Sequence, residues 1–198
     1  MTIIFTDTDF MTVRELETET GWPLDWTSTK GLSPYIKRLK GDVVGIEIGT
    51  CRAESTYLIL DECQNVKKIY TIDPFESYED WCGGIDQTTM DKFEAIAKEN
   101  LSKFGDRVEM VKKSSVDALD TFEDGKADFV FIDGDHSYEA TYNDLCNYYP
   151  KLRAGGLFSG HDYNLHEVKK AIADFREKFK VRIPIQMSIN SVWFWYKA

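Results

Sequence analysis

The sequence has few cysteines, no long apolar run and no excess of positive charge. Its four cysteines are widely spaced and form no CxxC pair of the kind that zinc and redox sites use, so we expect free thiols at Cys51, Cys63, Cys82 and Cys146. No stretch approaches the roughly 20 apolar residues that span a bilayer, which argues against membrane contact. The N-terminus has neither the basic nor the apolar region of a signal peptide, so we expect a cytoplasmic protein.

The shortage of positive charge also bears on nucleic acids. The chain has 24 Lys and Arg residues against 34 Asp and Glu residues, a net charge of -10, and its lysine pairs are scattered among carboxylates. Proteins that bind nucleic-acid phosphates use clustered basic side chains. The sequence therefore disfavours DNA or RNA as a partner or substrate. Nothing in it decides whether the chain forms a homo-oligomer.

What the sequence does contain is a regular alternation of strand-length apolar runs with segments of helical period. The expected strands are at 43–49, 67–75, 107–113, 127–135 and 157–163, and the expected helices are at 54–63, 88–105, 116–122, 137–153 and 166–180. Such alternation predicts parallel βαβ units. We expect Gly105 to close the second helix, the Gly155-Gly156 pair to break the fourth, and residues 183–198 to form a terminal hairpin.

These elements predict the fold class. We expect one α/β domain over residues 1–198, a doubly wound, mostly parallel sheet of seven strands with helices on both faces and an antiparallel C-terminal edge hairpin. Residues 1–40 would form an N-terminal helical cap segment, and residues 41–198 a Rossmann-like core. Ligands of open parallel sheets bind beyond the carboxyl ends of the strands, so the residues at those ends are the candidates for function.

The loop after the first strand lacks two of the three glycines of a dinucleotide fingerprint. Cys51 takes the place of the second glycine and Glu54 that of the third, which disfavours a ligand with a pyrophosphate. Gly49 lets a ligand come close to the backbone, and Glu47 can attract an ammonium or sulfonium group directly or through water. An ordinary strand-to-helix turn explains the same residues equally well.

The second strand end adds an acidic residue. Asp73 follows Gly49 by 24 residues (73 − 49), near the interval of about 20 at which a carboxylate accepts hydrogen bonds from ribose hydroxyls. The alternative is a turn or capping role before Pro74. Together, Gly49 and Asp73 favour a ligand that contains adenosine.

Four successive segments, EIGTCRAEST, IYTIDPF, DFVFIDGDHSYE and LRAGGLFSGHDY, resemble the motifs of class I S-adenosylmethionine-dependent methyltransferases. The resemblance spans roughly residues 40–180 and is to the small-molecule O-methyltransferase group that includes the macrocin-type sugar methyltransferases. It implies methyl transfer from S-adenosylmethionine to a small hydroxylated acceptor, a sugar or a phenolic natural product. It also implies a cofactor site, with Ser115 near the adenine, made of Glu47, Gly49, Thr50, Asp73, Ser115 and Asp133.

The last two strand ends carry candidates for a metal and a base. Asp133, His161 and Asp162 would converge from adjacent strands, and such oxygen and nitrogen donors can hold Mg²⁺ or Mn²⁺. By the resemblance, Asp133 and Asp162 are metal ligands and Asp135 is the general base. His161 stands where those enzymes tend to have a second acidic residue. Because imidazole is a poorer ligand of Mg²⁺, His161 favours Mn²⁺, Fe²⁺ or a metal-free reaction.

Other roles for these residues stay open on the sequence alone. His136 and His161 are alternative general bases, since an ordinary imidazole titrates near neutral pH. Structural roles are a helix cap for His136 and a loop hydrogen bond for His161. An NAD-dependent oxidoreductase is an alternative from a different enzyme class, and the missing glycines of the dinucleotide fingerprint argue against it. A non-catalytic nucleoside-binding module would have no need of the clustered acidic and histidine side chains.

Overall fold

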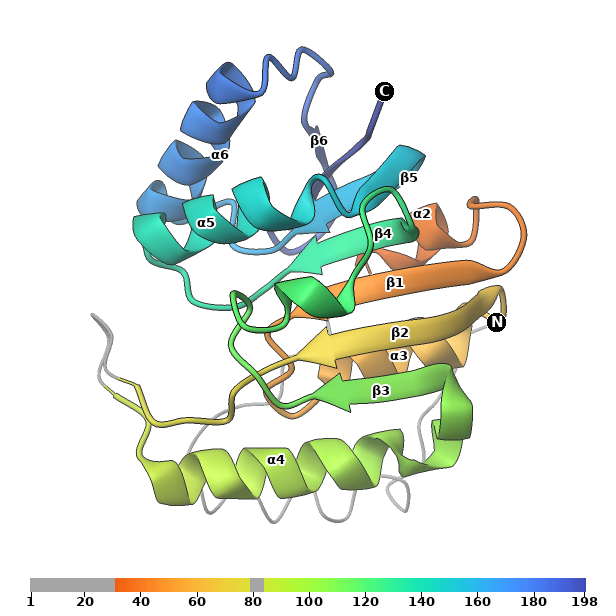
Figure 1. Ribbon diagram of the computed structural model, residues 1–198, viewed down its shortest axis with the longest axis vertical. Coiled ribbons are helices and arrows are strands. Elements are labelled where there is room, and N and C mark those ends of the chain that lie inside the picture. Colours follow the sequence, from red (N-terminus) through yellow and green to blue (C-terminus); the bar gives the residue numbers. More distant parts are fainter. Residues whose placement is uncertain (1–30, 79–83) are drawn as a thin grey trace.

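The structure, a computed structural model, describes residues 31–78 and 84–198 and contains one sheet of seven strands. The strand order is β3-β2-β1-β4-β5-β7-β6 (Figure 1). Five strands are parallel: β1 (Val43–Ile48), β2 (Val66–Ile72), β3 (Val108–Val111), β4 (Ala127–Ile132) and β5 (Leu152–Gly160). The hairpin of β6 (Gln186–Met187) and β7 (Trp193–Tyr196) adds the antiparallel edge, which confirms the predicted fold class.

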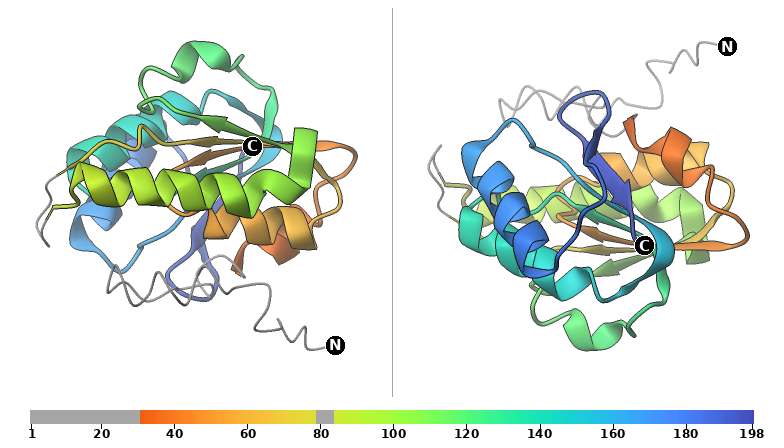
Figure 2. Two further views of the ribbon diagram at one scale, coloured as in Figure 1. Left: turned by 90° about the horizontal axis from the view of Figure 1, so that it is seen from below. Right: turned by 90° about the horizontal axis from the view of Figure 1, so that it is seen from above.

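Helices cover both faces of this sheet, as Figure 2 shows. One face carries α2 (Ser33–Ile36), α3 (Glu54–Glu62) and α4 (Gln87–Leu101), and the other carries α5 (Tyr138–Tyr148) and α6 (His166–Lys178). Each face has its own apolar core because strand side chains alternate between faces. Phe129 and Phe131 of β4 pack into one core, and Val130 and Ile132 into the other. This double burial explains why the β4 sequence is apolar throughout.

Several expected elements have different bounds in the structure. The segment 116–122 forms only the short 3-10 helix η3 (Leu119–Thr121). The second helix ends at Leu101, and the 3-10 helix η2 (Ser102–Arg107) follows it with Gly105 at a φ of +52°. The second strand ends at Ile72, two residues before Pro74, which has no N–H to donate.

The Gly155-Gly156 pair was expected to break a helix and instead lies inside β5. The preceding helix already ends at Tyr148. Pairing of β5 with β4 is irregular here, because Leu152 lies opposite Ala127 and Leu157 opposite Phe129. Gly155 has a φ of +74°, a backbone conformation that glycine adopts without steric cost. The two glycines therefore accommodate a bulge in β5.

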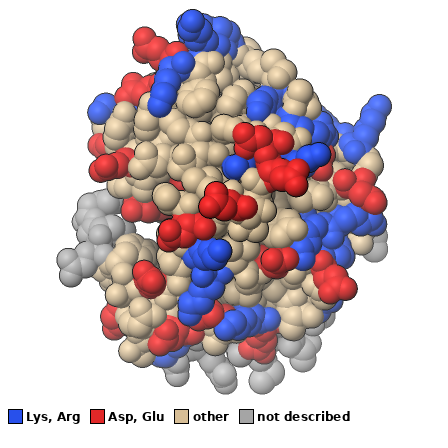
Figure 3. Space-filling model, viewed as in Figure 1, with Lys and Arg blue, Asp and Glu red and all other residues tan. Residues whose placement is uncertain are grey.

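Parts of the expected organisation fall outside the described residues. Most of the N-terminal cap segment does, as does the expected thiol of Cys82, whereas Cys51, Cys63 and Cys146 are free. Among the helices of residues 31–78 and 84–198, none is long and apolar enough to cross a membrane. Acidic and basic side chains are interspersed on the face shown in Figure 3.

Candidate active site

A cavity of about 460 Å³ lies beyond the carboxyl ends of the parallel strands, on the side to which their arrowheads point in Figure 1. This volume falls in the range of small-molecule sites. Six of the residues predicted for the site line it: Gly49, Asp73, Ser115, Asp133, Asp135 and His136. Further lining residues that the sequence did not single out include apolar Ile48, Ile72, Met90 and Phe93 and acidic Asp144.

Gly49 begins the loop that forms one wall of the cavity. Its φ is +92°, and a Cβ atom at this position would lie 2.0 Å from the backbone oxygen of Asp133. The fold itself thus requires glycine here, because the loop after β1 passes directly against the exit of β4. Cys51 and Ala53 in the same loop also have positive φ values, of 46° and 65°. Such left-handed residues are strained and need support from their surroundings.

Asp73 supplies that support from the end of β2. Its Oδ2 accepts hydrogen bonds from the backbone N–H groups of Thr50 (3.1 Å) and Cys51 (3.0 Å), and its Oδ1 accepts one from Phe75 N (2.8 Å). The turn role considered for Asp73 is therefore present. Its side chain also faces the cavity, so a contact with a ribose stays a compatible prediction.

Glu47 lies beneath the loop and is completely buried. Its Oε2 accepts hydrogen bonds from the hydroxyls of Thr56 and Thr71, and the Thr71 hydroxyl lies 2.7 Å from that of Thr50. Burial raises the pKa of Glu47 to about 8. Glu47 and Thr50 are absent from the described lining of the cavity, so their predicted contacts with the cofactor stay predictions. Oε1 of Glu47 has no hydrogen-bond partner among the described residues.

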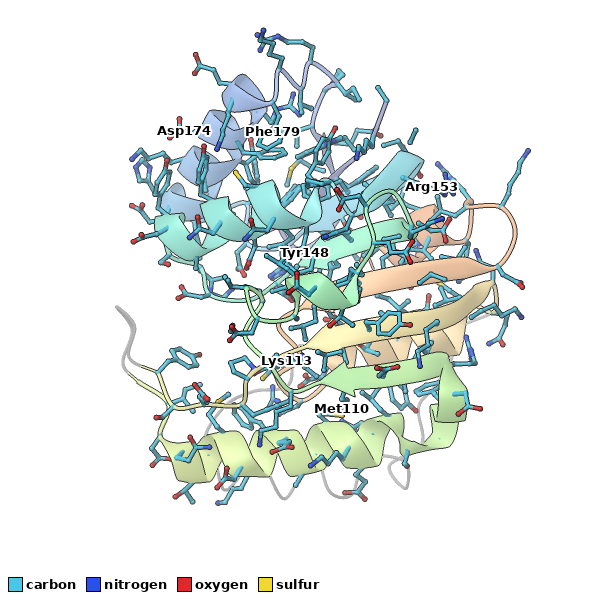
Figure 4. All side chains as sticks on the ribbon, viewed as in Figure 1. Met110, Lys113, Tyr148, Arg153, Asp174 and Phe179 are labelled. Carbon is cyan, nitrogen blue, oxygen red and sulfur yellow. The ribbon has the colours of Figure 1, made fainter. Side chains whose placement is uncertain are left out.

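The segment after β3 is held by α5. The hydroxyl of Tyr148, which Figure 4 shows extending from α5, donates to the backbone oxygen of Ser115 at 2.6 Å. Asp144, one turn earlier on α5, is nearly buried and lines the cavity next to Ser115, and its burial raises its pKa to about 6. Sequence reasoning missed Asp144. The available signal was an acidic residue on the apolar face of a helix, which is a rare position unless the residue has a partner.

Two histidines and two aspartates meet beyond β4 and β5. Asp162 Oδ2 lies 2.8 Å from His136 Nε2 and 3.0 Å from His161 Nδ1, and His161 Nδ1 lies 3.6 Å from Asp133 Oδ1. Asp162 has a φ of +56°. Its neighbour Tyr163 donates from its backbone N–H to Ser191 O (3.1 Å), which ties this corner to the β6–β7 turn.

The close packing of these charges shifts their pKa values. Burial raises the pKa of Asp133 to about 6. Burial alone would lower the pKa of His161, but its hydrogen bond to Asp162 and the charge of Asp133 outweigh this and raise it to about 9. Asp162 likewise raises the pKa of His136. The two histidines in turn outweigh the burial of Asp162 and hold its pKa well below the ordinary value.

The helix-cap role considered for His136 is wrong. The cap of α5 is Ser137, whose Oγ accepts from the backbone N–H of Ala140 at 3.3 Å. Asp135 accepts from the backbone N–H of Ser137 at 2.7 Å and keeps an exposed carboxylate on the cavity wall, where it was predicted as the base.

The donor set of the predicted metal site differs in one member. One ligand atom each of Asp133, His136 and Asp162 lie within 4.8 Å of one another. The predicted set had His161 in the place of His136. His161 instead turns its Nδ1 toward both carboxylates. Two carboxylate oxygens and one imidazole nitrogen are suitable donors for a divalent cation, so the residues present fit a metal.

Comparison with known proteins identifies a family. A family model described as a methyltransferase domain matches residues 46–163, which include both walls of the cavity. An uncharacterized protein of Acanthamoeba polyphaga mimivirus is 30% identical over 153 residues, which are 69% of this chain. The chain spans 62% of the length of that relative.

Solved structures share the fold at lower identity. An O-methyltransferase from Bacillus cereus in complex with S-adenosylhomocysteine is 18% identical, with a TM-score of 0.68 over 98% of this chain and 93% of that one. The O-methyltransferase NovP is 22% identical, with a TM-score of 0.61 over 87% of this chain and 77% of that one. The family match, the sheet order and the cavity at the strand ends confirm the resemblance found in the sequence: the chain belongs to the methyltransferase family and has its Rossmann-like class I fold.

Proposed function

We propose that this chain transfers a methyl group from S-adenosylmethionine to a hydroxyl of a small molecule, with help from a divalent metal. The observation that carries the proposal is the shared cavity, whose lining includes Gly49 and Asp73 together with Asp133 and His136. A nucleoside site and a polar cluster that fits a metal are thus adjacent. Methyl transfer needs this arrangement, because donor and acceptor must meet in line.

The chain's own residues suggest how the cofactor would be held. Asp73 occupies the strand end at which a carboxylate accepts hydrogen bonds from ribose hydroxyls. Ser115 and Asp144 lie together on the wall where the resemblance implies the adenine. The carboxylates around the cavity favour a cationic ligand without phosphates. S-adenosylmethionine, when bound, supplies a methyl group activated by its sulfonium.

The reaction also requires that a proton leave the acceptor. The acceptor oxygen bonds to the methyl carbon while the carbon–sulfur bond breaks, and the hydroxyl proton passes to a base. Asp135 is the proposed base, because its carboxylate is exposed to the cavity and fixed by Ser137 N. Asp133 and Asp162 would hold the metal. A metal bound there would lower the pKa of an acceptor hydroxyl next to it.

One contact favours a metal-free variant of the same reaction. Asp162 lies 2.8 Å from His136 Nε2, so this carboxylate would orient the imidazole and stabilise its charged form after proton uptake. Either way, the acceptor proposed from the resemblance is a sugar or a phenolic natural product in the cytoplasm. An oxidoreductase that binds NAD gains no support, since Cys51 occupies a glycine position of the fingerprint.

Binding and turnover can be tested separately. We expect calorimetry to detect S-adenosylhomocysteine binding and no NAD binding. Methyl transfer is measured from labelled S-adenosylmethionine to a panel of sugars, catechols and phenols. Asp135→Asn should bind S-adenosylhomocysteine as the parent does and lose at least about 100-fold in turnover, in line with the contribution of a general base. Binding of NAD alone would refute the proposed function, and full turnover by Asp135→Asn would refute the base.

A further inference from the structure

We propose that His136 is a direct ligand of the metal and that His161 is not a ligand but a hydrogen-bond donor to the two carboxylate ligands. Because one ligand is then an imidazole, the site prefers Mn²⁺ and similar transition metals to Mg²⁺. This inference rests on the proposed function, which needs a divalent cation at Asp133 and Asp162. His136 thereby takes the metal-binding role that was expected of His161.

The donor atoms have the spacing of ligands. His136 Nε2 and Asp162 Oδ2 are 2.8 Å apart. Neighbouring ligands of an octahedral ion with bonds of about 2.1 Å lie about 3 Å apart, so these two atoms already have the separation of neighbouring ligands. An oxygen of Asp133 lies within 4.8 Å of the other donor atoms, close enough for the three side chains to share one ion.

The imidazole of His136 is placed to share an ion with Asp162. Its Nε2 is shielded from solvent and makes no hydrogen bond of acceptable geometry among the described residues, although Asp162 Oδ2 lies 2.8 Å away. Neighbouring ligands of one ion have this arrangement, because they lie close together and are joined through the ion instead of by a hydrogen bond. His161 differs, because its Nδ1 does form a hydrogen bond of 3.0 Å with Asp162.

The fold holds His161 outside the proposed ligand set. Its backbone N–H donates to Ile132 O (3.1 Å), and its backbone oxygen accepts from Trp193 Nε1 (3.0 Å), so β4 and β7 fix its position. From there Nδ1 reaches Asp162 and lies 3.6 Å from Asp133. Donors that orient metal-bound carboxylates in this way change affinity without choosing the metal, whereas an imidazole ligand favours transition metals over Mg²⁺.

The three histidines of the chain make a matched test possible. The variants are His136→Ala, His136→Asp, His161→Asn and, as a control, His166→Ala, which alters an exposed residue of α6. Titration calorimetry with Mn²⁺ or Mg²⁺ alone gives affinities for each protein. Pulsed electron paramagnetic resonance of bound Mn²⁺ reports whether an imidazole nitrogen is coordinated. Circular dichroism and S-adenosylhomocysteine binding without metal show that each variant is folded and keeps its cofactor site.

We expect the parent and His166→Ala to bind Mn²⁺ at least about tenfold more tightly than Mg²⁺ and to show nitrogen coupling. His136→Ala should lose the coupling and the preference, and His136→Asp should bind both metals without coupling. His161→Asn should weaken both metals by about 10- to 100-fold and keep the coupling. Coupling that persists in His136→Ala, or is lost in His161→Asn, would overturn the assignment, as would a parent that binds no metal. Absence of S-adenosylhomocysteine binding would instead refute the proposed function.

Discussion

Burial changes the chemistry of Glu47, whose side chain has no exposed surface. A carboxyl group removed from water favours its neutral form, and the hydroxyls of Thr56 and Thr71 only partly compensate. Thr71 connects Glu47 to Thr50 in the loop after β1, so the protonation of Glu47 is coupled to the support of this loop. From the sequence, Glu47 was expected to attract a cation by its negative charge. In the folded chain its carboxyl group is largely neutral and supports the loop after β1.

The pH dependence of stability should reveal this. The pKa of Glu47 rises from 4.5 to about 8 on folding, so between these values the folded state holds a proton that the unfolded state has released. This contribution stabilises the fold at low pH and is lost as the pH rises through about 8. Urea unfolding of Glu47→Gln should therefore show a stability advantage over the parent that grows from about pH 5 to about pH 8. A constant difference would contradict the prediction.

Gly49 illustrates a residue that packing alone makes necessary. A methyl group at this position would meet the backbone of Asp133 at 2.0 Å, and the φ of +92° is unfavourable for alanine. We expect Gly49→Ala to lower the free energy of unfolding by on the order of 2–4 kcal/mol. Gly41→Ala is the matched control, since Gly41 has a φ of +81° with nothing within 4 Å. It should cost only about 1 kcal/mol, and equal losses in urea unfolding would contradict the steric argument.

At the scale of elements, the loop between β1 and α3 depends on the end of β2. The loop contains left-handed residues at Cys51 and Ala53, which isolated chains adopt rarely. Asp73 holds it by accepting from two successive N–H groups. A single carboxylate thus both shapes the wall of the cavity and faces into it, so its structural and binding roles are inseparable in that one side chain.

Removal of this carboxylate should loosen the loop before it affects the sheet. In Asp73→Ala we expect faster hydrogen exchange at the amides of Thr50 and Cys51, with little change in β4. Affinity for S-adenosylhomocysteine should fall at least about tenfold, because the charge-assisted hydrogen bonds proposed between Asp73 and the ribose hydroxyls are lost. Asp135→Asn serves as the control, since the side chain of Asp135 accepts from Ser137 N and not from the loop, and this change should leave both measurements unchanged. Unaltered exchange in Asp73→Ala would contradict the bracing role.

At the scale of the molecule, the cavity exists because separate strands end at one edge of the sheet. Residues after β1, β2, β3 and β4 close it together, so a ligand there contacts parts of the chain that are distant in sequence. A ligand that binds only the folded chain stabilises it by about 2.7 kcal/mol at 100 times its dissociation constant. The melting temperature should rise by roughly 5–10 °C with S-adenosylhomocysteine at that concentration and not with NAD. No shift at saturation would contradict the site.

The sequence by itself determined the order and type of most elements, the sheet class and the strand ends at which the site lies. Periodic burial is a local pattern. The apolar run of β4 and the polar residues that follow it can therefore be recognised without knowing which strands lie beside them. Element ends were less accurate where tertiary packing decides them. The glycines at 155 and 156 were expected to break a helix, and pairing of β5 with β4 places them at an irregularity within a strand instead.

Only the tertiary structure decided which site residues meet. His136 and Asp162 are 26 positions apart (162 − 136) and come together because β4 and β5 are adjacent and parallel. No periodicity shows that His136 turns toward Asp162 while Ser137 caps the helix, or that Glu47, expected to attract a cationic ligand, is completely buried. The direction of a side chain depends on backbone angles and on contacts far along the chain, and these are properties of the assembled sheet and helices.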